Sequence, residues 1–132
     1  MGIPSIAVSL ATFVNPDFMY AAKCGAKLIK LMVKARMPKG TFLNVNVPNK
    51  KPRQIKGIKM TRQALVPIHG TFRKRTDPNF REYYWMTGKI PVRKKDDRVD
   101  TYALNNDYVT VTPIHSDQTD YSFLEKLNHW EV

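Results

Sequence analysis

The sequence predicts an α/β fold, because residues 1–50 alternate between strand and helix patterns. Residues 3–10 form a short apolar run of strand length, residues 16–37 place apolar side chains at helical spacing, and residues 41–47 alternate apolar with polar side chains. The chain has 132 residues, 42% of them hydrophobic, which is enough for the core of one ordinary domain. We therefore expect a single domain built on a strand–helix–strand unit.

The helix pattern that follows the apolar run favours a strand for the run itself. Alone, such a run fits either a parallel-sheet strand covered on both faces or a buried helical segment. Asn15 is a good N-cap, Pro16 suits the first helical position, and Asp17 suits the first turn. The two expected faces of the helix are apolar (Phe18, Ala21, Ala22, Gly25, Leu28, Ile29, Met32 and Val33) and basic (Lys23, Lys27, Lys30 and Lys34). Pro38 and Gly40 end the helix.

The second strand is predicted at Thr41 to Val47, and the first strand has no hairpin partner before it. We therefore expect residues 1–50 to be the last strand–helix–strand unit of an α/β core whose earlier strands are not in this chain. Residues 51–132 are expected to hold a hairpin arm, a returning strand and a C-terminal helix.

The hairpin is predicted by a turn signal at residues 77–79 (Asp-Pro-Asn), after a strand-like run at residues 55–63. The aromatic residues of this segment are Phe80, Tyr83, Tyr84 and Trp85. Consecutive aromatic residues place large rings on both faces of a strand, which an isolated ribbon cannot bury. A second chain is the expected cover, and base stacking on these rings is the less favoured alternative.

Three aspartates, Asp96, Asp97 and Asp100, form the one carboxylate cluster of the sequence. They suit a hard divalent cation, but the favoured interpretation is structural, with Asp100 capping a short helix at residues 101–104. A strand is predicted at Tyr108 to Thr112, and the tail predicts a final helix with Tyr121, Leu124, Leu127 and Trp130 on one face.

Lys and Arg outnumber Asp and Glu by 22 to 11, which gives a net charge of +11. The excess lies on the lysine face of the first helix and in clusters at residues 49–53, 73–75 and 93–95. A solvated surface explains such clusters more often than a binding site, although phosphate ligands or nucleic acid remain the functional alternative.

No catalytic constellation is evident in the sequence. His69, His115 and His129 are far apart, and neither a paired-histidine motif nor a glycine-rich phosphate loop occurs. The single Cys24 excludes a disulfide within the chain, and no signal peptide or membrane span is indicated. We expect a cytoplasmic protein.

The order of the segments resembles the C-terminal half of the SurE family of metal-dependent nucleotidases over nearly the whole chain. The matching segments are GIPSIAVSL, PKGTFLNVNVP, IKGIKMTRQ, RTDPNFREYYW and DTYALNNDYVTVTPIHSD, followed by an amphipathic helix. LNVNVP and YVTVTPIHSDQT are the most specific of them.

The resemblance implies a Rossmann-like core with a projecting β-hairpin and a C-terminal helix. It also implies a dimer or tetramer in which the subunits exchange the hairpin or the C-terminal helix. It implies hydrolysis of nucleoside monophosphates with a divalent cation, Mg²⁺ or Mn²⁺. The family holds that cation with two consecutive aspartates, a serine and an asparagine, all upstream of the segment matched by GIPSIAVSL. Asp96-Asp97 is not that pair, because it follows VRKK and not an apolar strand.

The sequence therefore predicts the C-terminal portion of a SurE-type phosphatase, inactive alone, with no catalytic or metal-binding residue of its own. The residues expected to contribute to oligomerisation are Phe80, Tyr83, Tyr84, Trp85, Asp117 and Tyr121. A basic oligomeric module that binds nucleic acid or another polyanion is the alternative, and a membrane partner is not expected.

Overall fold

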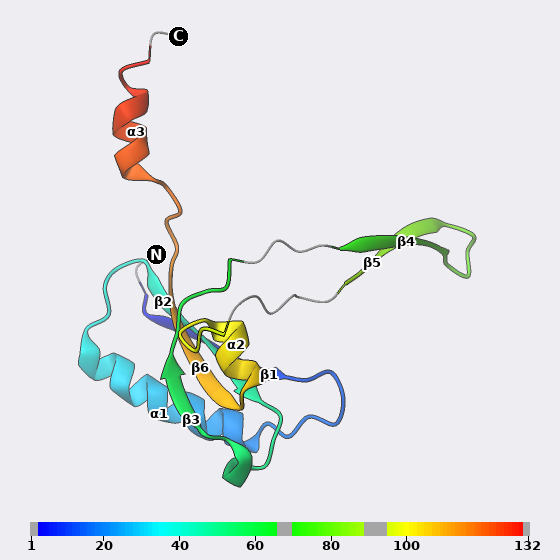
Figure 1. Ribbon diagram of the computed structural model, residues 1–132, viewed down its shortest axis with the longest axis horizontal. Helices are drawn as coiled ribbons and strands as arrows, with labels where there is room; N and C mark the ends of the chain where they lie inside the picture. Colours follow the sequence, from blue (N-terminus) through cyan, green and yellow to red (C-terminus); the bar gives the residue numbers. More distant parts are fainter. Residues whose placement is uncertain (1–2, 66–69, 89–94, 131–132) are drawn as a thin grey trace.

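A four-stranded mixed sheet covered by one long helix forms the body of the protein (Figure 1). The computed structural model describes residues 3–65, 70–88 and 95–130. The sheet has the order β1-β2-β6-β3. The elements of the body are β1 (Ser5–Ala11), α1 (Met19–Ala35), β2 (Thr41–Pro48), a 3-10 turn (Pro52–Gln54), β3 (Gly57–Met60), α2 (Asp100–Asn105) and β6 (Tyr108–His115). This arrangement confirms the predicted α/β fold.

The strand register directs one apolar face of the sheet toward α1. β1 runs parallel to β2, β6 is antiparallel to β2, and β3 runs parallel to β6. Ile6 pairs with Leu43 and Val8 with Val45, so both pairs lie on the face that α1 covers. The buried core residues are Ala21, Cys24, Leu28, Val45, Val47, Val109 and Val111. The buried valines alternate with other residues along β2 and β6, which is the pattern from which the sequence predicts these strands.

The start of α1 differs from the prediction. The helix begins at Met19 rather than at Pro16, and its N-cap is Phe18 rather than Asn15. Asn15 has a left-handed backbone (φ 46°), and its carbonyl accepts a hydrogen bond from the side-chain amide of Asn49 at 3.2 Å. The Asp17 carboxylate accepts from the Met19 N–H at 3.0 Å. A contact from the end of β2 thus holds this loop in a conformation that the local capping signals do not encode.

β1 also differs from the expectation of a strand covered on both faces. It lies at the edge of the sheet, and most of its residues are exposed. α1 approaches it closely at Gly25, where an added Cβ would lie 3.2 Å from a methyl carbon of Val8. Within the described residues, only α1 covers this strand, and only on one face.

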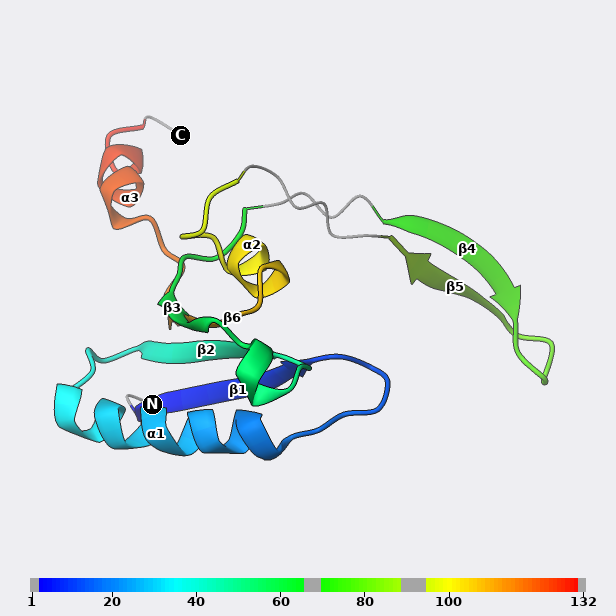
Figure 2. The same cartoon turned by 60° about the horizontal axis from the view of Figure 1, so that its bottom comes forward.

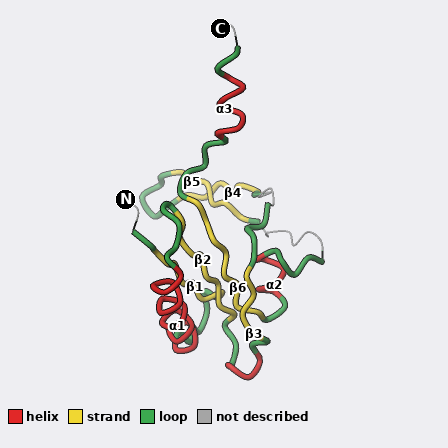
Figure 3. The backbone as a smooth tube through the Cα atoms, turned by 90° about the vertical axis from the view of Figure 1, so that its left-hand side faces the viewer, coloured by secondary structure: helices red, strands yellow, loops and turns green. Residues whose placement is uncertain are grey.

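Two arms extend from the body in different directions (Figures 1 and 2). One is the hairpin of β4 (Thr71–Thr76) and β5 (Glu82–Thr87), and the other is α3 (Tyr121–Leu127). Asp77 closes the predicted turn by accepting hydrogen bonds from the Asn79 and Arg81 N–H groups. Neither arm contains a buried residue. In the tube view, α3 stands apart from the sheet (Figure 3).

The remaining elements lie close to their predicted positions. α2 begins one residue before the expected helix, and β6 extends beyond Thr112 to His115. Asp120 caps α3, since its carboxylate accepts from the Phe123 N–H at 3.0 Å. None of the described helices is long and apolar enough to cross a membrane.

The packing of α1 on the sheet yields the first prediction. Leu28 is 4% exposed within the core, whereas Leu31 on the same helix is 52% exposed. We expect Leu28→Ala to lower the free energy of unfolding by about 2–5 kcal/mol, because it removes buried methyl groups and leaves a cavity. Leu31→Ala is the matched control and should change it by less than about 0.5 kcal/mol. Urea denaturation followed by circular dichroism measures both, and equal effects would contradict the proposed core.

Candidate functional site

The carboxyl ends of β1 and β2 meet at one edge of the sheet, because the two strands are parallel. Ala11 pairs with Pro48 there, and the antiparallel β6 begins at the same edge. In open α/β sheets, ligands bind outside the carboxyl ends of the strands. This edge, which we call the carboxyl edge, is therefore the first place to look for a functional site.

Two clefts of about 290 Å³ each open at the carboxyl edge. Asn49 and Lys50 line both clefts. Thr12 and Asp107 contribute to the first cleft, and Lys51 to the second. The side chain of Asn49 also holds the loop after β1, since its Oδ1 accepts from the Asp17 N–H at 3.4 Å. One amide thus joins the segments that follow two parallel strands.

The charged side chains that line the two clefts are Lys50, Lys51, Asp17 and Asp107. Lys50 Nζ lies 2.6 Å from the Asp107 carboxylate and Lys56 Nζ lies 3.9 Å from it. The hydrogen bond from Lys50 lowers the pKa of Asp107 below its usual value. Asp107 is the one acid in the first cleft and is already engaged by ammonium groups. Since a divalent cation needs several oxygen ligands, one carboxylate that is already paired with lysines does not make this cleft a metal site.

Asp100 has a structural role at the start of α2, as expected, but it is the first residue of the helix and not its N-cap. α2 starts at Asp100 itself, and its N-cap is Val99, which has no side-chain cap. The Asp100 carboxylate accepts from the Ala64 N–H at 3.0 Å and from the Thr101 N–H at 2.6 Å. It therefore stabilises both the first turn of α2 and the segment that leads to the hairpin.

Asp96 and Asp97, which precede α2, are engaged by basic side chains of β3 and of the segment after it. Asp96 accepts from an Arg62 guanidinium N–H at 2.9 Å, and Asp97 forms an ion pair with Lys59. The Arg98 N–H, followed by Arg62, lowers the pKa of Asp96, and Lys59 lowers that of Asp97. In the described part of the chain, no group of three His, Cys, Asp or Glu side chains is arranged to hold a metal ion.

The two histidines that the structure describes belong to different segments of the chain. His69 lies outside the described residues, as do Arg93 and Lys94 of the third basic cluster. His115 is the last residue of β6, and its Nδ1 lies 3.0 Å from the Asp117 carbonyl oxygen. His129 lies after the end of α3.

The residues expected in oligomerisation lie on the two arms, where the structure separates them. Tyr83 and Trp85 share one face of the hairpin with Arg73 and Arg75, and the Arg75 guanidinium carbon is 5.7 Å from the Trp85 ring centroid. Tyr84 lies on the opposite face, and Phe80 is in the turn and fully exposed. The two faces therefore differ in charge.

Asp117 and Tyr121 contact each other where α3 begins. The Tyr121 hydroxyl donates to the Asp117 carboxylate. This bond, with those from Thr119, lowers the pKa of Asp117 to about 2, and the same contact raises the pKa of Tyr121. The pair fixes the first turn of α3 relative to the linker that follows β6.

The sequence does not predict the clefts at the carboxyl edge, because the residues that line them lie in separate segments. The sequence pattern places Asn49 and Lys50 in a basic cluster and gives no reason to connect them with Asp107. The signal that would have joined them was the parallel pairing of the first two strands, because it brings both carboxyl ends to one edge.

Comparisons with known proteins agree on one family. The model of the survival protein SurE matches residues 1–69. A 5'-nucleotidase SurE from Syntrophobacter fumaroxidans is 39% identical over 132 residues, which are 100% of this chain and 53% of that protein. A 5'-nucleotidase SurE from Thermoanaerobacter pseudethanolicus is 40% identical over 131 residues, which are 99% of this chain and 52% of that protein.

A solved structure gives the same result. The crystal structure of the SurE protein from Aquifex aeolicus matches with a TM-score of 0.76 and 35% sequence identity, covering 97% of this chain and 52% of that chain. The chain thus spans about half the length of the curated relatives it matches, and the matched part is their C-terminal half.

The ion pairs before α2 yield a pH prediction. The folded-state pKa of Asp97 is below its ordinary value of 3.8, so its contribution to stability is present above that pH and is lost as the pH falls through the folded pKa. We expect the urea midpoint of Asp97→Asn to be lower than that of the parent protein at pH 7 and to converge with it as the pH falls below the folded-state pKa of Asp97.

The control for this prediction is Glu125→Gln on the exposed α3. Its urea midpoint should follow the parent protein at every pH, because Glu125 forms no ion pair within the described residues. If the difference in urea midpoint between Asp97→Asn and the parent protein did not change with pH, the pair with Lys59 would not stabilise the fold.

Proposed function

Because the chain belongs to the SurE family, we propose that it forms the C-terminal half of a metal-dependent phosphatase acting on nucleoside monophosphates. The observation that carries the proposal is the match of the whole chain, at 39% identity, to a protein named 5'-nucleotidase. The structural match over 97% of the chain supports it, because the arms and the sheet take part in the same superposition.

The carboxylates of the described chain do not fit a divalent cation. Asp96, Asp97 and Asp107 accept hydrogen bonds from basic side chains, and Asp100 accepts from two backbone N–H groups. Neighbouring ammonium and guanidinium groups compete for these oxygens and repel a cation. We therefore propose that the ligands for Mg²⁺ or Mn²⁺ come from a polypeptide segment other than the described residues.

The contribution of this chain is to bind and position the phosphate ester. Lys50 and Lys51 bring two ammonium groups to the carboxyl edge, beside Asp17 and Asp107, and the position of the clefts favours a phosphate there. The side-chain amide of Asn49 keeps the loop after β1 against the end of β2. The two arms serve assembly in this proposal.

We also propose that the protein assembles with itself, as a dimer or tetramer, through the hairpin and α3. Six large apolar side chains of the hairpin are exposed: Phe72, Phe80, Tyr83, Tyr84, Trp85 and Met86. Those of α3 and its end are Tyr121, Phe123, Leu124 and Trp130. Two exposed apolar arms on one chain are unusual for a monomer and mark an interaction surface.

One observation favours the alternative of nucleic-acid binding. The hairpin face that bears Arg73, Arg75, Tyr83 and Trp85 combines guanidinium groups with aromatic rings and contains no acid. Such a face binds single strands by stacking and phosphate contacts. Tight, sequence-selective binding at physiological salt would favour this alternative, whereas weak binding that salt abolishes reflects only counterion release.

The catalytic prediction compares the isolated chain with the same chain fused to the N-terminal half of a relative. We expect no Mn²⁺- or Mg²⁺-dependent phosphate release from nucleoside monophosphates by the purified 132-residue protein. Activity should appear when the N-terminal half of the Syntrophobacter fumaroxidans relative is fused ahead of it. Phosphate release is measured colorimetrically, with Asp96→Ala and Asp97→Ala as controls. Turnover by the isolated chain that either control abolishes would show that these aspartates bind the metal.

The assembly prediction concerns the hairpin rings. Burying apolar area contributes about 25 cal/mol per Å², so several rings at one contact are worth a few kcal/mol. We expect sedimentation velocity at micromolar concentration to show a dimer or larger species. Trp85→Ala should shift it toward monomer, whereas Leu31→Ala, which removes an exposed leucine from α1, should not. A monomeric parent protein would refute the proposal.

A further inference from the structure

The loop between β1 and α1 exposes large apolar side chains at one end of the sheet. It comprises residues 12–18, and Phe13 near its start is fully exposed. Val14 and Phe18 are exposed as well. Isolated apolar side chains on a surface are common, but three large ones exposed within six residues make a candidate contact surface.

Hydrogen bonds hold both halves of this loop. The Thr12 hydroxyl donates to the Val14 carbonyl oxygen at 2.8 Å and accepts from the Val14 N–H at 3.1 Å. The side-chain amide of Asn49 holds the second half through the Asn15 carbonyl and the Asp17 N–H. The loop therefore presents its exposed phenylalanine ring at little further cost in conformational entropy when a ligand binds.

The two ends of the loop line the two clefts of the carboxyl edge. Thr12 lines the first cleft, together with Lys50, and Asp17 lines the second. Phe13 follows Thr12 directly, so its Cα lies about 3.8 Å from the Cα of a residue in the cleft wall. Figure 2 shows the loop reaching beyond the end of β1. The exposed ring is therefore at the rim of the first cleft.

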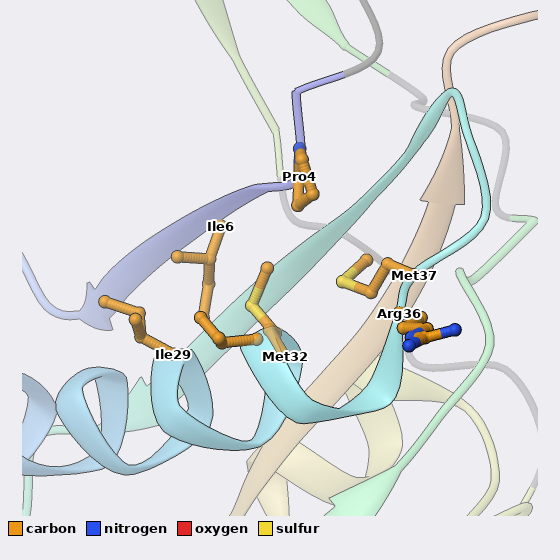
Figure 4. Close-up of a pocket in the computed structure, with 7 residues that line it drawn as sticks. Pro4, Ile6, Ile29, Met32, Arg36 and Met37 are labelled. Atoms are coloured by element: carbon orange, nitrogen blue, oxygen red, sulfur yellow. The ribbon is translucent and has the colours of Figure 1, made fainter.

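The apolar groove of about 560 Å³ between β1 and α1 lies at the other end of the strand. Figure 4 shows Pro4, Ile6 and Met37 among the residues that line it. Ile6 and Thr12 are six residues apart along an extended strand, which separates them by about 20 Å. That distance exceeds the length of a nucleoside monophosphate, so a ligand with its phosphate in the first cleft reaches the loop and not the groove.

We propose that Phe13 binds the base of the nucleoside monophosphate by stacking, while the phosphate lies in the first cleft. The proposal rests on the proposed function and assigns a specificity-determining residue to it. A nucleoside monophosphate joins an anionic group to a flat aromatic base, and this edge offers the ammonium group of Lys50 and the ring of Phe13. Every base has a face that stacks on an aromatic ring. The phenylalanine side chain has no hydrogen-bonding group, so it accepts any base and overlaps most with the larger purines.

The size of the loop favours a base over a protein partner. A stable protein interface buries about 800 Å² on each side, whereas a large apolar side chain buries about 150–250 Å², so three of them fall short. The hairpin, with six exposed large apolar side chains, is the larger surface for assembly. A polypeptide that covered the loop would also lie over the clefts that Thr12 and Asp17 line.

The binding test uses the full 132-residue chain fused behind the N-terminal half of the Syntrophobacter fumaroxidans relative, with EDTA present so that no turnover occurs. Equilibrium dialysis measures the Kd for radiolabelled AMP. Phe13→Leu keeps an apolar side chain and removes the ring, so we expect it to raise this Kd by about tenfold. Phe13→Tyr keeps the ring and should stay within about twofold of the parent chain.

Steady-state kinetics of the same fused chain with Mn²⁺ separate the base from the phosphate. Phe13→Leu should raise the KM for AMP by about tenfold and leave kcat within about twofold, because stacking contributes equally in the ground state and the transition state. Ribose 5-phosphate carries the phosphate without a base, so its KM should not change. Leu31→Ala, which removes an exposed leucine from α1, is the matched control and should change neither KM. Circular dichroism of each variant confirms that it folds as the parent does.

Three results would overturn the proposal: no AMP binding by the parent fused chain, an equal Kd for the parent and Phe13→Leu, or an equal rise in KM for ribose 5-phosphate. A Phe13→Leu variant that sediments closer to monomer and binds AMP as the parent does would assign the loop to assembly instead. A fused chain that binds AMP through Phe13 and releases no phosphate would refute the proposed function alone.

Discussion

The parallel pairing of β1 with β2 is the constraint on which the rest of the structure depends. Parallel neighbours cannot be joined by a tight turn, so the chain must cross one face of the sheet between them. α1 is that crossover, and its buried face with Leu28 supplies much of the core. The same pairing brings the ends of both strands to one edge, where Asn49 joins the two loops. Helix, core and candidate site thus follow from one strand orientation.

The charges of the chain have two different roles in the fold. Before α2, Asp96 and Asp97 neutralise Arg62 and Lys59, so these ion pairs join the segment before α2 to β3 and the residues that follow it. At the carboxyl edge, Asp107 engages two lysines while Lys51 contributes further positive charge to the cleft. Acidic and basic side chains therefore occur together at both places, and the Lys50–Asp107 pair joins the segment after β2 to the start of β6.

The sequence predicted those features that local patterns encode. Alternating side chains located β2, and the Asp-Pro-Asn turn located the hairpin, because both signals lie within a few residues. The helix start was misplaced because Asn49, 34 residues away from Asn15, holds the preceding loop. The cleft was missed for the same reason, since Asn49 and Asp107 come together only through the strand register. The roles of Asp96 and Asp97 were decided by partners more than thirty residues distant.

The edge strand β1 and the candidate site are connected through the geometry of the sheet. A strand that adds parallel to β1 ends at the same edge as β1 and β2, beside Thr12 and Asn49. Residues that follow such a strand would face the cleft that Lys50 lines. Asp96, Asp97 and Asp107 are engaged by basic side chains and Asp100 by backbone N–H groups, so in the proposed function the ligands for a cation come from another segment, and such a strand would bring them beside the cleft.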